Sequence, residues 1–459
     1  MSVIQTINPS SNELLKAYQE HSPTEVAGIL AKAHHTFGTW STLSFGERSE
    51  KMKKAAGLLR EKKEKLARMA MLEMGKLRKD GIAEVEKCAW VCDFYADSAK
   101  GMLQDEIIES DASKSYVAFR PLGVILAIMP WNFPYWQVFR FFAPSAMAGN
   151  TSVLKHASNV SGCSLEIEAL LKEAGMEGVM NSILVKPDKI ASVIENPLVK
   201  AVTLTGSTKA GRSVASKAGQ MLKKTVLELG GSDAYLVLGD ADITEAARLC
   251  AASRMINTGQ SCIAAKRFIV VKDAEEKFTR AFTELMMSKK MGPPSADTSD
   301  YGPLARTDLR DALHMQVEES VNQGASCLAG GYIPAIPGAY YPATVLTNVR
   351  KGMPAYDDEL FGPVAAIIAA EDEQDAIRIA NDTSFGLGSS VFTTNMEKGE
   401  RIAANELQAG SCFVNSAVKS DPRLPFGGIK DSGYGRELSG YGIKEFVNIK
   451  TVYIRNSGN

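Results

Sequence analysis

A cysteine among small and polar residues is the first candidate for nucleophilic chemistry. Cys262 lies in the segment 257–265, NTGQSCIAA, which predicts an accessible thiol on a loop or at the start of a helix. Backbone dipoles at such a place would stabilise a thiolate, which is the reactive form of cysteine. Considered alone, the same residue is better explained as a buried cysteine, a small apolar side chain in the core.

Two further polar residues lie in apolar or rigid surroundings. Glu228 lies in the run VLEL at 226–229, directly before two glycines, and burial would raise its pKa toward that of a general base. Asn132 lies in the turn PWNFP at 130–134, after an apolar strand, where its amide could donate a hydrogen bond to an oxyanion. The alternatives are a carboxylate that faces water and an asparagine that only forms the turn.

A glycine-containing turn joins a predicted strand to a predicted helix at 205–213. Its glycines and the helix N-terminus would present backbone N–H groups to a phosphate. The spacing from Gly206 to Gly211 nearly matches a P-loop, and the segment 236–240 resembles the strand and aspartate that accompany one. However, Arg212 stands where a P-loop has lysine. A nucleoside triphosphatase and a purely structural turn are both open on these residues alone.

The elements that must position these residues alternate between strand and helix. In the first half, strands are expected at 115–120, 123–129, 153–155, 181–185 and 201–205, and helices at 49–74, 84–102, 161–174 and 209–223. After a boundary at 229–233, strands are expected at 235–238, 268–271 and 364–369, and helices at 243–255, 274–287 and 308–323. This alternation predicts an α/β protein with two doubly wound domains.

Composition excludes several classes of protein. The chain of 459 residues has a formal net charge of −1 and therefore no basic footprint for nucleic acid. No apolar stretch reaches the ~20 residues of a membrane helix, and the N-terminus has no apolar core like that of a signal peptide. Seven scattered cysteines without a CxxC pair predict a reducing, cytoplasmic environment, and five histidines without a ligand pattern predict no metal site.

Taken together, these segments resemble the aldehyde dehydrogenase superfamily over most of the chain. The order and spacing of the whole set are much more specific than any single motif. The matching residues are Pro130-Trp131-Asn132-Phe133-Pro134, Lys155, Thr205-Gly206-Ser207, Glu228-Leu229-Gly230-Gly231, Gly259-Gln260-Ser261-Cys262, Glu359-Leu360-Phe361-Gly362-Pro363 and Pro425-Phe426-Gly427-Gly428. The resemblance displaces the P-loop interpretation.

The resemblance implies a chemistry for three residues. The Cys262 thiolate would attack the aldehyde carbon, while the Asn132 amide and the Cys262 backbone N–H hold the oxyanion; losing one such donor costs about 10²–10³ in rate. Hydride transfer to a nicotinamide then leaves a thioester, and Glu228 activates the water that releases the acid.

The resemblance also implies a dinucleotide site. Its predicted members are Trp131, Lys155, Ser158, Gly206, Ser207, Gly211, Leu229, Glu359 and Phe361. Glu359 would bind the nicotinamide ribose, Phe361 would help to position the cofactor, and Ser207 would face the pyrophosphate. Many NAD-specific relatives carry glutamate where this chain has Ser158, so a 2′-phosphate would meet no repulsion and Lys155 could attract it. We therefore expect NAD and also NADP as cofactors.

Arg140 predicts the substrate, because it stands eight positions after Asn132, as does a substrate-binding arginine of succinate-semialdehyde dehydrogenases. Its guanidinium could hold a distal carboxylate bidentately. A second arginine of that branch is replaced by Ile256. The predicted substrate-binding residues are Arg140, Trp136, Asp421 and Arg423. Oxidation of succinate semialdehyde is thus the leading prediction, and the alternatives are an uncharged medium-chain or aromatic aldehyde, or a non-catalytic relative.

The same resemblance implies a division of the chain. We expect a cofactor-binding domain at 1–110 and 124–230, a catalytic domain at 231–420, and oligomerisation strands at 111–123 and 441–459. The strands would pair with another subunit, so the expected assembly is a homodimer or homotetramer. The only other partner expected is the small aldehyde, with no nucleic acid and no membrane.

Overall fold

A six-stranded sheet organises the first half of the chain. In the computed structural model, which describes residues 2–456, its order is β17-β9-β8-β5-β6-β7. All neighbours are parallel except β17 and β9. The strands are β5 (Val124–Met129), β6 (Thr151–His156), β7 (Met180–Ser182), β8 (Val199–Thr205), β9 (Lys224–Glu228) and β17 (Gly433–Tyr434). Their apolar runs are buried because helices pack on the sheet, as in other parallel sheets.

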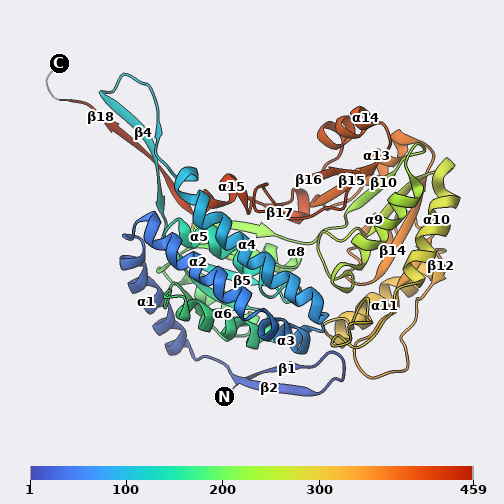
Figure 1. Ribbon diagram of the computed structural model, residues 1–459, viewed down its shortest axis with the longest axis horizontal. Helices are drawn as coiled ribbons and strands as arrows, with labels where there is room; N and C mark the ends of the chain where they lie inside the picture. The colour runs from blue at the N-terminus through green and yellow to red at the C-terminus, as the bar shows by residue number, and fades with distance from the viewer. Residues whose placement is uncertain (1, 457–459) are drawn as a thin grey trace.

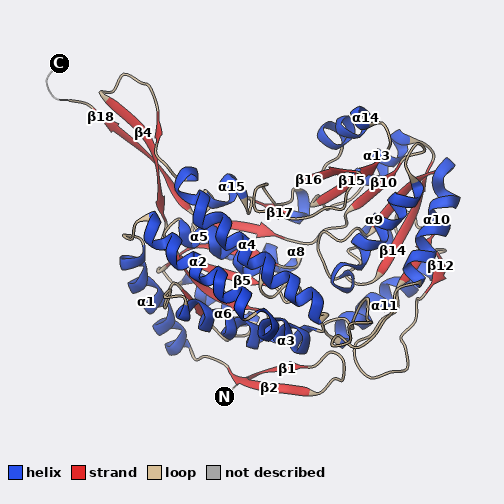
Figure 2. Ribbon diagram, in the orientation of Figure 1, coloured by secondary structure: helices blue, strands red, loops and turns tan. Residues whose placement is uncertain are grey.

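The helices around this sheet form its outer layers (Figure 2). They are α1 (Pro23–Trp40), α2 (Phe45–Glu61), α3 (Lys63–Met74), α4 (Arg78–Met102), α5 (Trp136–Met147), α6 (Ser161–Glu173), α7 (Ile190–Glu195) and α8 (Thr208–Gln220). One predicted helix, 49–74, is wrong in detail, because the chain breaks at Lys62 and continues as a second helix. The apolar periodicity crosses this break without interruption, so the sequence did not reveal it.

A seven-stranded sheet organises the second body, in the order β12-β13-β14-β11-β10-β15-β16. Its strands are β10 (Ala234–Val237), β11 (Arg267–Val271), β12 (Ser326–Ala329), β13 (Thr344–Thr347), β14 (Val364–Ala370), β15 (Gly388–Phe392) and β16 (Ser411–Val414). Only β12 runs antiparallel to its neighbour. The helices are α9 (Ile243–Met255), α10 (Lys272–Met287), α11 (Thr307–Asn322), α12 (Pro354–Asp357), α13 (Glu373–Asn381) and α14 (Met396–Arg401). The predicted class, two α/β domains, is confirmed.

A narrow β arm projects from the first body (Figure 1). It contains β3 (Glu106–Ile107), β4 (Lys114–Pro121) and β18 (Val447–Ile454), all antiparallel. The two long strands fall within the predicted oligomerisation segments, of which residues 457–459 lie outside the described residues. A hairpin of β1 (Val3–Ile7) and β2 (Leu14–Gln19) and the short helix α15 (Ser439–Ile443) complete the fold. Within residues 2–456, no helix is both long and apolar enough to span a membrane.

Asn150 joins the base of the arm to the first sheet. Its side-chain oxygen accepts hydrogen bonds from the backbone N–H groups of Leu122 (2.8 Å) and Gly123 (3.0 Å), and its amide donates to the carbonyl of Phe446 (2.9 Å). The side chain is buried.

Replacing Asn150 with alanine leaves three backbone groups without a partner. We expect Asn150→Ala to lower the free energy of unfolding by about 2–4 kcal/mol, and therefore the Tm, because each lost hydrogen bond is worth about 1 kcal/mol. Thermal unfolding monitored by fluorescence checks this, with Asn322→Ala at the exposed end of α11 as the control. An unchanged Tm for Asn150→Ala would contradict the prediction.

Candidate active site

The loop before Cys262 adopts an unusual backbone. Asn257, Thr258 and Gly259 all have positive φ, at 53°, 58° and 74°. A Cβ on Gly259 would lie 2.1 Å from the carbonyl oxygen of Gly362, so only glycine fits there. The buried Arg254 donates to the Gly259 carbonyl at 2.6 Å and fixes the turn. This tight turn directs the chain from the end of α9 back toward the first sheet.

Asn132 contacts the same loop from the first body. Its amide nitrogen donates to the carbonyl of Gln260 at 3.1 Å, and Asn257 donates to the Asn132 carbonyl at 2.8 Å. An amide carries two N–H groups, so one remains available for a ligand oxygen. These hydrogen bonds hold two segments that are far apart in the sequence next to each other. The donors of an oxyanion site need such a fixed arrangement.

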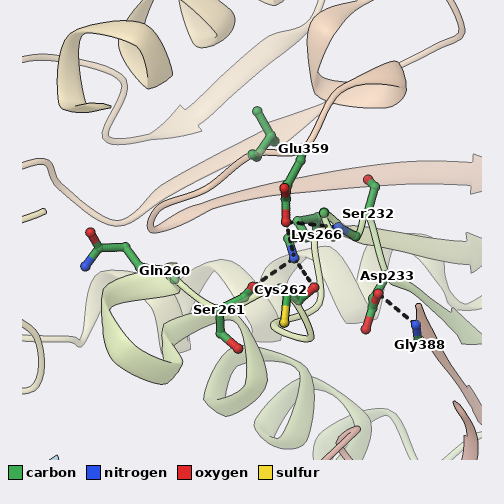
Figure 3. A network of polar contacts seen from close by, with 12 residues as sticks. Ser232, Asp233, Gln260, Ser261, Cys262, Lys266, Glu359 and Gly388 are labelled. Carbon is green, nitrogen blue, oxygen red and sulfur yellow. Dashed lines mark hydrogen bonds and ion pairs between the residues drawn. The ribbon is translucent and has the colours of Figure 1, made fainter. Parts of the chain in front are cut away.

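Lys266 fixes the nucleophile segment from behind (Figure 3). Its ammonium is fully buried, donates to the carbonyls of Ser261 (2.9 Å) and Cys262, and lies 3.4 Å from a carboxylate oxygen of Glu359. The same Glu359 oxygen accepts a hydrogen bond from the N–H of Gly231 at 3.1 Å. Because Lys266 binds the carbonyl side of the segment, the Cys262 sulfur projects from the opposite side.

The Cys262 thiol is half-buried and lines a cavity between the two bodies. Burial raises the pKa of Cys262 to about 12, against the opposing charges of Lys266 and Arg140. The thiol is therefore protonated at neutral pH, so a nearby base must take its proton before it can attack.

Glu228 is a buried carboxylate at the end of β9. Within the described chain neither of its oxygens has a hydrogen-bond partner. A Cβ on Gly427 would lie 2.7 Å from one of these oxygens, so this glycine leaves room for the carboxylate. Burial, followed by the neighbouring Glu437, raises the pKa of Glu228 well above its usual value, while Arg140 opposes the shift. Such a group can accept a proton near neutral pH.

Arg140 lies on α5 and lines the cavity, but its charge is already matched. Its side chain is 2% exposed and forms an ion pair with Glu437. Its guanidinium also lies 3.4 Å from the hydroxyl of Thr205 and 4.7 Å from the centre of the Phe426 ring. The predicted contact between Arg140 and a substrate carboxylate stays a prediction, and this ion pair would compete with it.

The other predicted substrate residues divide into two groups. Trp136 lines the cavity with Cys262. Asp421 and Arg423 instead pair with each other, with a closest approach of 2.6 Å, and neither belongs to the cavity wall. Sequence reasoning gave no role to Lys87, which does line the cavity. Lys87 lies three residues after the buried Glu84 on α4 and so shares its inward face, but the sequence alone does not show that Glu84 is buried.

Most of the predicted cofactor residues lie at the carboxyl ends of strands of the first sheet, whereas Glu359 and Phe361 come from the second body. Ser207 caps α8 and accepts a hydrogen bond from the N–H of Ala210 at 3.3 Å. A Cβ on Gly211 would lie 2.6 Å from the side chain of Leu229, so the helix approaches the strand closely. Trp131 and Phe361 meet edge to face, with ring centres 5.7 Å apart. Parallel α/β sheets bind dinucleotides at this edge.

Lys155 provides a test of whether these residues fit a nucleotide. Its side chain on β6 is 6% exposed and makes no hydrogen bond or ion pair with the described residues. Burial lowers the pKa of Lys155 to about 8. A ligand hydroxyl or phosphate would satisfy this ammonium. Arg212, by contrast, is engaged with Asp431 at 2.9 Å, which leaves no P-loop cation.

Comparison with known proteins agrees with this geometry. The profile of the aldehyde dehydrogenase family matches residues 1–452. A probable succinate-semialdehyde dehydrogenase (NADP(+)) of Synechocystis sp. is 48% identical over 98% of this chain and 99% of its own length. A succinate semialdehyde dehydrogenase (NAD(P)+) of Escherichia coli is 44% identical over 98% of this chain and 97% of its own length.

A solved structure is similar over the whole chain. The succinic semialdehyde dehydrogenase of Streptococcus pyogenes, in complex with NADP+, superimposes with a TM-score of 0.96 at 38% identity, covering 99% of this chain and 100% of the other. The chain therefore belongs to the aldehyde dehydrogenase family.

The raised pKa of Cys262 predicts a steep pH dependence of its reactivity. Since only the thiolate reacts, we expect alkylation of Cys262 by iodoacetamide to accelerate about tenfold per pH unit from pH 7 to 9. Peptide mass spectrometry separates this site from Cys327, which is exposed and serves as an internal reference. A Cys262 rate that is flat above pH 7 would show that the thiol is already ionised.

Proposed function

We propose that this enzyme oxidises succinate semialdehyde to succinate, with NADP or NAD as the hydride acceptor. The observation that carries the proposal is a cavity with the Cys262 thiol at one side and the cations Arg140 and Lys87 on its wall. The described lining residues include five cations and three carboxylates, an excess of positive charge that favours an aldehyde with a carboxylate. The similarity to enzymes named for this substrate supports the same choice.

The first chemical step is attack of the Cys262 sulfur on the aldehyde carbon. Glu228 takes the thiol proton, because burial raises its pKa and so makes the carboxylate a stronger base. The free N–H of Asn132 and the backbone N–H of Cys262 then bind the oxygen of the tetrahedral thiohemiacetal. The fixed loop at 257–259 keeps these donors in place, so little reorganisation is needed.

The second step converts the adduct to a thioester and then to the acid. A bound nicotinamide supplies the hydride acceptor. Glu228 afterwards removes a proton from the water that attacks the thioester carbon. The Glu228 carboxylate is buried and thus shielded from bulk water. Because Gly427 has no Cβ, it leaves room for this carboxylate during both proton transfers.

Lys155 and Ser158 are proposed to accept the adenosine end of either cofactor. The Lys155 ammonium is buried and without a partner in the described chain, and Ser158 brings no negative charge to the start of the following turn. A 2′-phosphate or a pair of ribose hydroxyls fits this arrangement.

The arm is proposed to join subunits into a homodimer or a homotetramer. Ile449 and Tyr453 on β18 and Ile107 on β3 are exposed, at 61%, 50% and 70%. Exposed apolar side chains on a projecting sheet favour burial against a second copy. A cytoplasmic location is proposed as well, because all seven cysteines are free thiols.

The proposed substrate is tested by comparing aldehydes with and without a carboxylate. We expect kcat/KM for succinate semialdehyde to exceed that for butanal and benzaldehyde by about 10- to 100-fold, as one charge-assisted contact provides. Formation of the reduced cofactor at 340 nm measures all three. Equal or higher rates with the uncharged aldehydes would contradict the proposal and indicate that the substrate is an uncharged aldehyde. The Cys262→Ala variant gives the background rate.

The proposed use of both cofactors is tested by introducing at position 158 the carboxylate that many NAD-specific relatives carry. We expect Ser158→Glu to raise the KM for NADP at least about tenfold, because the new charge repels a 2′-phosphate, and to leave the KM for NAD within a few-fold. Ser158→Ala is the matched control and retains both activities. Equal effects of Ser158→Glu on the two cofactors would mean that the 2′-phosphate of NADP does not lie near residue 158.

A further inference from the structure

Lys87 is a cation on the cavity wall that has no anionic partner among the described residues. Lys87 projects from α4 and lines the same cavity as Cys262. Its ammonium donates a hydrogen bond to the hydroxyl of Ser420 at 2.8 Å and lies 4.2 Å from the centre of the Trp136 ring. Among residues 2–456 it forms no ion pair, although most of the side chain is shielded from water.

The other buried cations on this wall are already neutralised. Lys76 is paired with Glu84, and both side chains are almost fully buried. Arg140 is paired with Glu437 in the same way. Lys419 and Lys289 also line the cavity and form no ion pair with the described residues. Lys419 is exposed to water, where a charge interacts weakly with a ligand, and Lys289 is half-buried.

Acidic groups near the cavity do not cancel the charge of Lys87. Asp80 lines the cavity too, but its cationic neighbours are Lys76 and Lys79. Asp421 and Glu84 act on Lys87 only through space, and Asp421 is itself paired with Arg423.

The surroundings of Lys87 favour an added anion. Burial and the charge of Arg140 lower the pKa of Lys87 to about 8, so the ammonium pays for its desolvation without a counter-ion. A carboxylate that entered the cavity would relieve this cost, and Ser420 already orients the ammonium. Trp136 beside it offers an apolar face to a short methylene chain.

We propose that Lys87 binds the distal carboxylate of the substrate and is the residue that selects aldehydes ending in a carboxylate. This inference rests on the proposed function, since it concerns the far end of the same substrate. The aldehyde carbon lies at Cys262, the methylene groups lie along Trp136, and the carboxylate meets the ammonium of Lys87. Arg140 keeps its ion pair with Glu437 throughout.

The test compares Lys87→Met, Lys87→Arg and the wild type on succinate semialdehyde and butanal. We expect Lys87→Met to raise the KM for succinate semialdehyde about 10- to 100-fold and to leave kcat/KM for butanal within about threefold, which also shows that the variant folds. Lys87→Arg should recover part of the loss. Lys100→Met, an exposed lysine on the same helix, is the matched control.

Two outcomes for Lys87→Met would overturn the role of Lys87. One is an unchanged KM for succinate semialdehyde in Lys87→Met. The other is an equal loss with both aldehydes, which would mean that Lys87 has no selective role. If the KM rises instead in Arg140→Ala with kcat for butanal intact, the carboxylate belongs to Arg140 and the inference is wrong.

A second measurement separates this inference from the proposed function. Succinate should inhibit butanal oxidation by the wild type competitively with butanal, and Lys87→Met should weaken that inhibition about 10-fold or more. If the wild type shows no preference for succinate semialdehyde, the proposed function fails, while loss of succinate inhibition in Lys87→Met would still support the carboxylate site. Equal inhibition of both proteins would overturn the site whatever the substrate.

Discussion

The geometry of the candidate active site depends on the hydrogen bonds that the buried ammonium of Lys266 donates to the carbonyls of Ser261 and Cys262. Two non-glycine residues of the loop, Asn257 and Thr258, lie in the left-handed region, and each such residue costs about 1–3 kcal/mol. That strain persists only because the surroundings hold the loop from several sides. Lys266 binds two successive carbonyls at the nucleophile, and Arg254 binds the carbonyl of Gly259. The strain is thus balanced by charged hydrogen bonds in a place that water does not reach.

The charges around Glu228, the proposed general base, are closely balanced. Glu228 and Glu437 are both buried, and Arg140 is the cation closest to neutralising them. If Arg140 left Glu437 to bind a substrate, Arg436 would remain as the other cation acting on Glu228, and the pKa of Glu228 would rise further. Holding the ion pair therefore limits the rise in the pKa of Glu228. A substrate carboxylate is better served by a cation outside this balance.

The sequence predicted most strands of the two sheets because their signals are local, whereas the candidate catalytic residues were inferred from the order and spacing of several motifs. Continuous apolar runs gave β5, β8, β10 and β14, and the motifs around Cys262, Glu228 and Asn132 are short and ordered along the chain. The ion pair of Arg140 with Glu437 could not be predicted, because the two residues are far apart in sequence and meet only after the C-terminal segment folds back. Asp421 and Arg423 were expected at the cavity, although they pair beside it, because no local pattern shows how the C-terminal segment is placed.

Lys87 was overlooked because a charged helix predicts a solvated face, and only the packing of α4 against α5 reveals that one of its lysines points inward. The remaining partners of this site come from the C-terminal segment. It leaves the second sheet after β16, supplies Ser420 to the ammonium of Lys87, passes Glu228 at Gly427, and adds β17 to the first sheet. The proposed carboxylate site and the proposed general base are thus connected through one largely irregular segment that crosses between the two bodies. A displacement of this segment would alter both functions together, so the two bodies act as one catalytic unit although each has its own sheet and core.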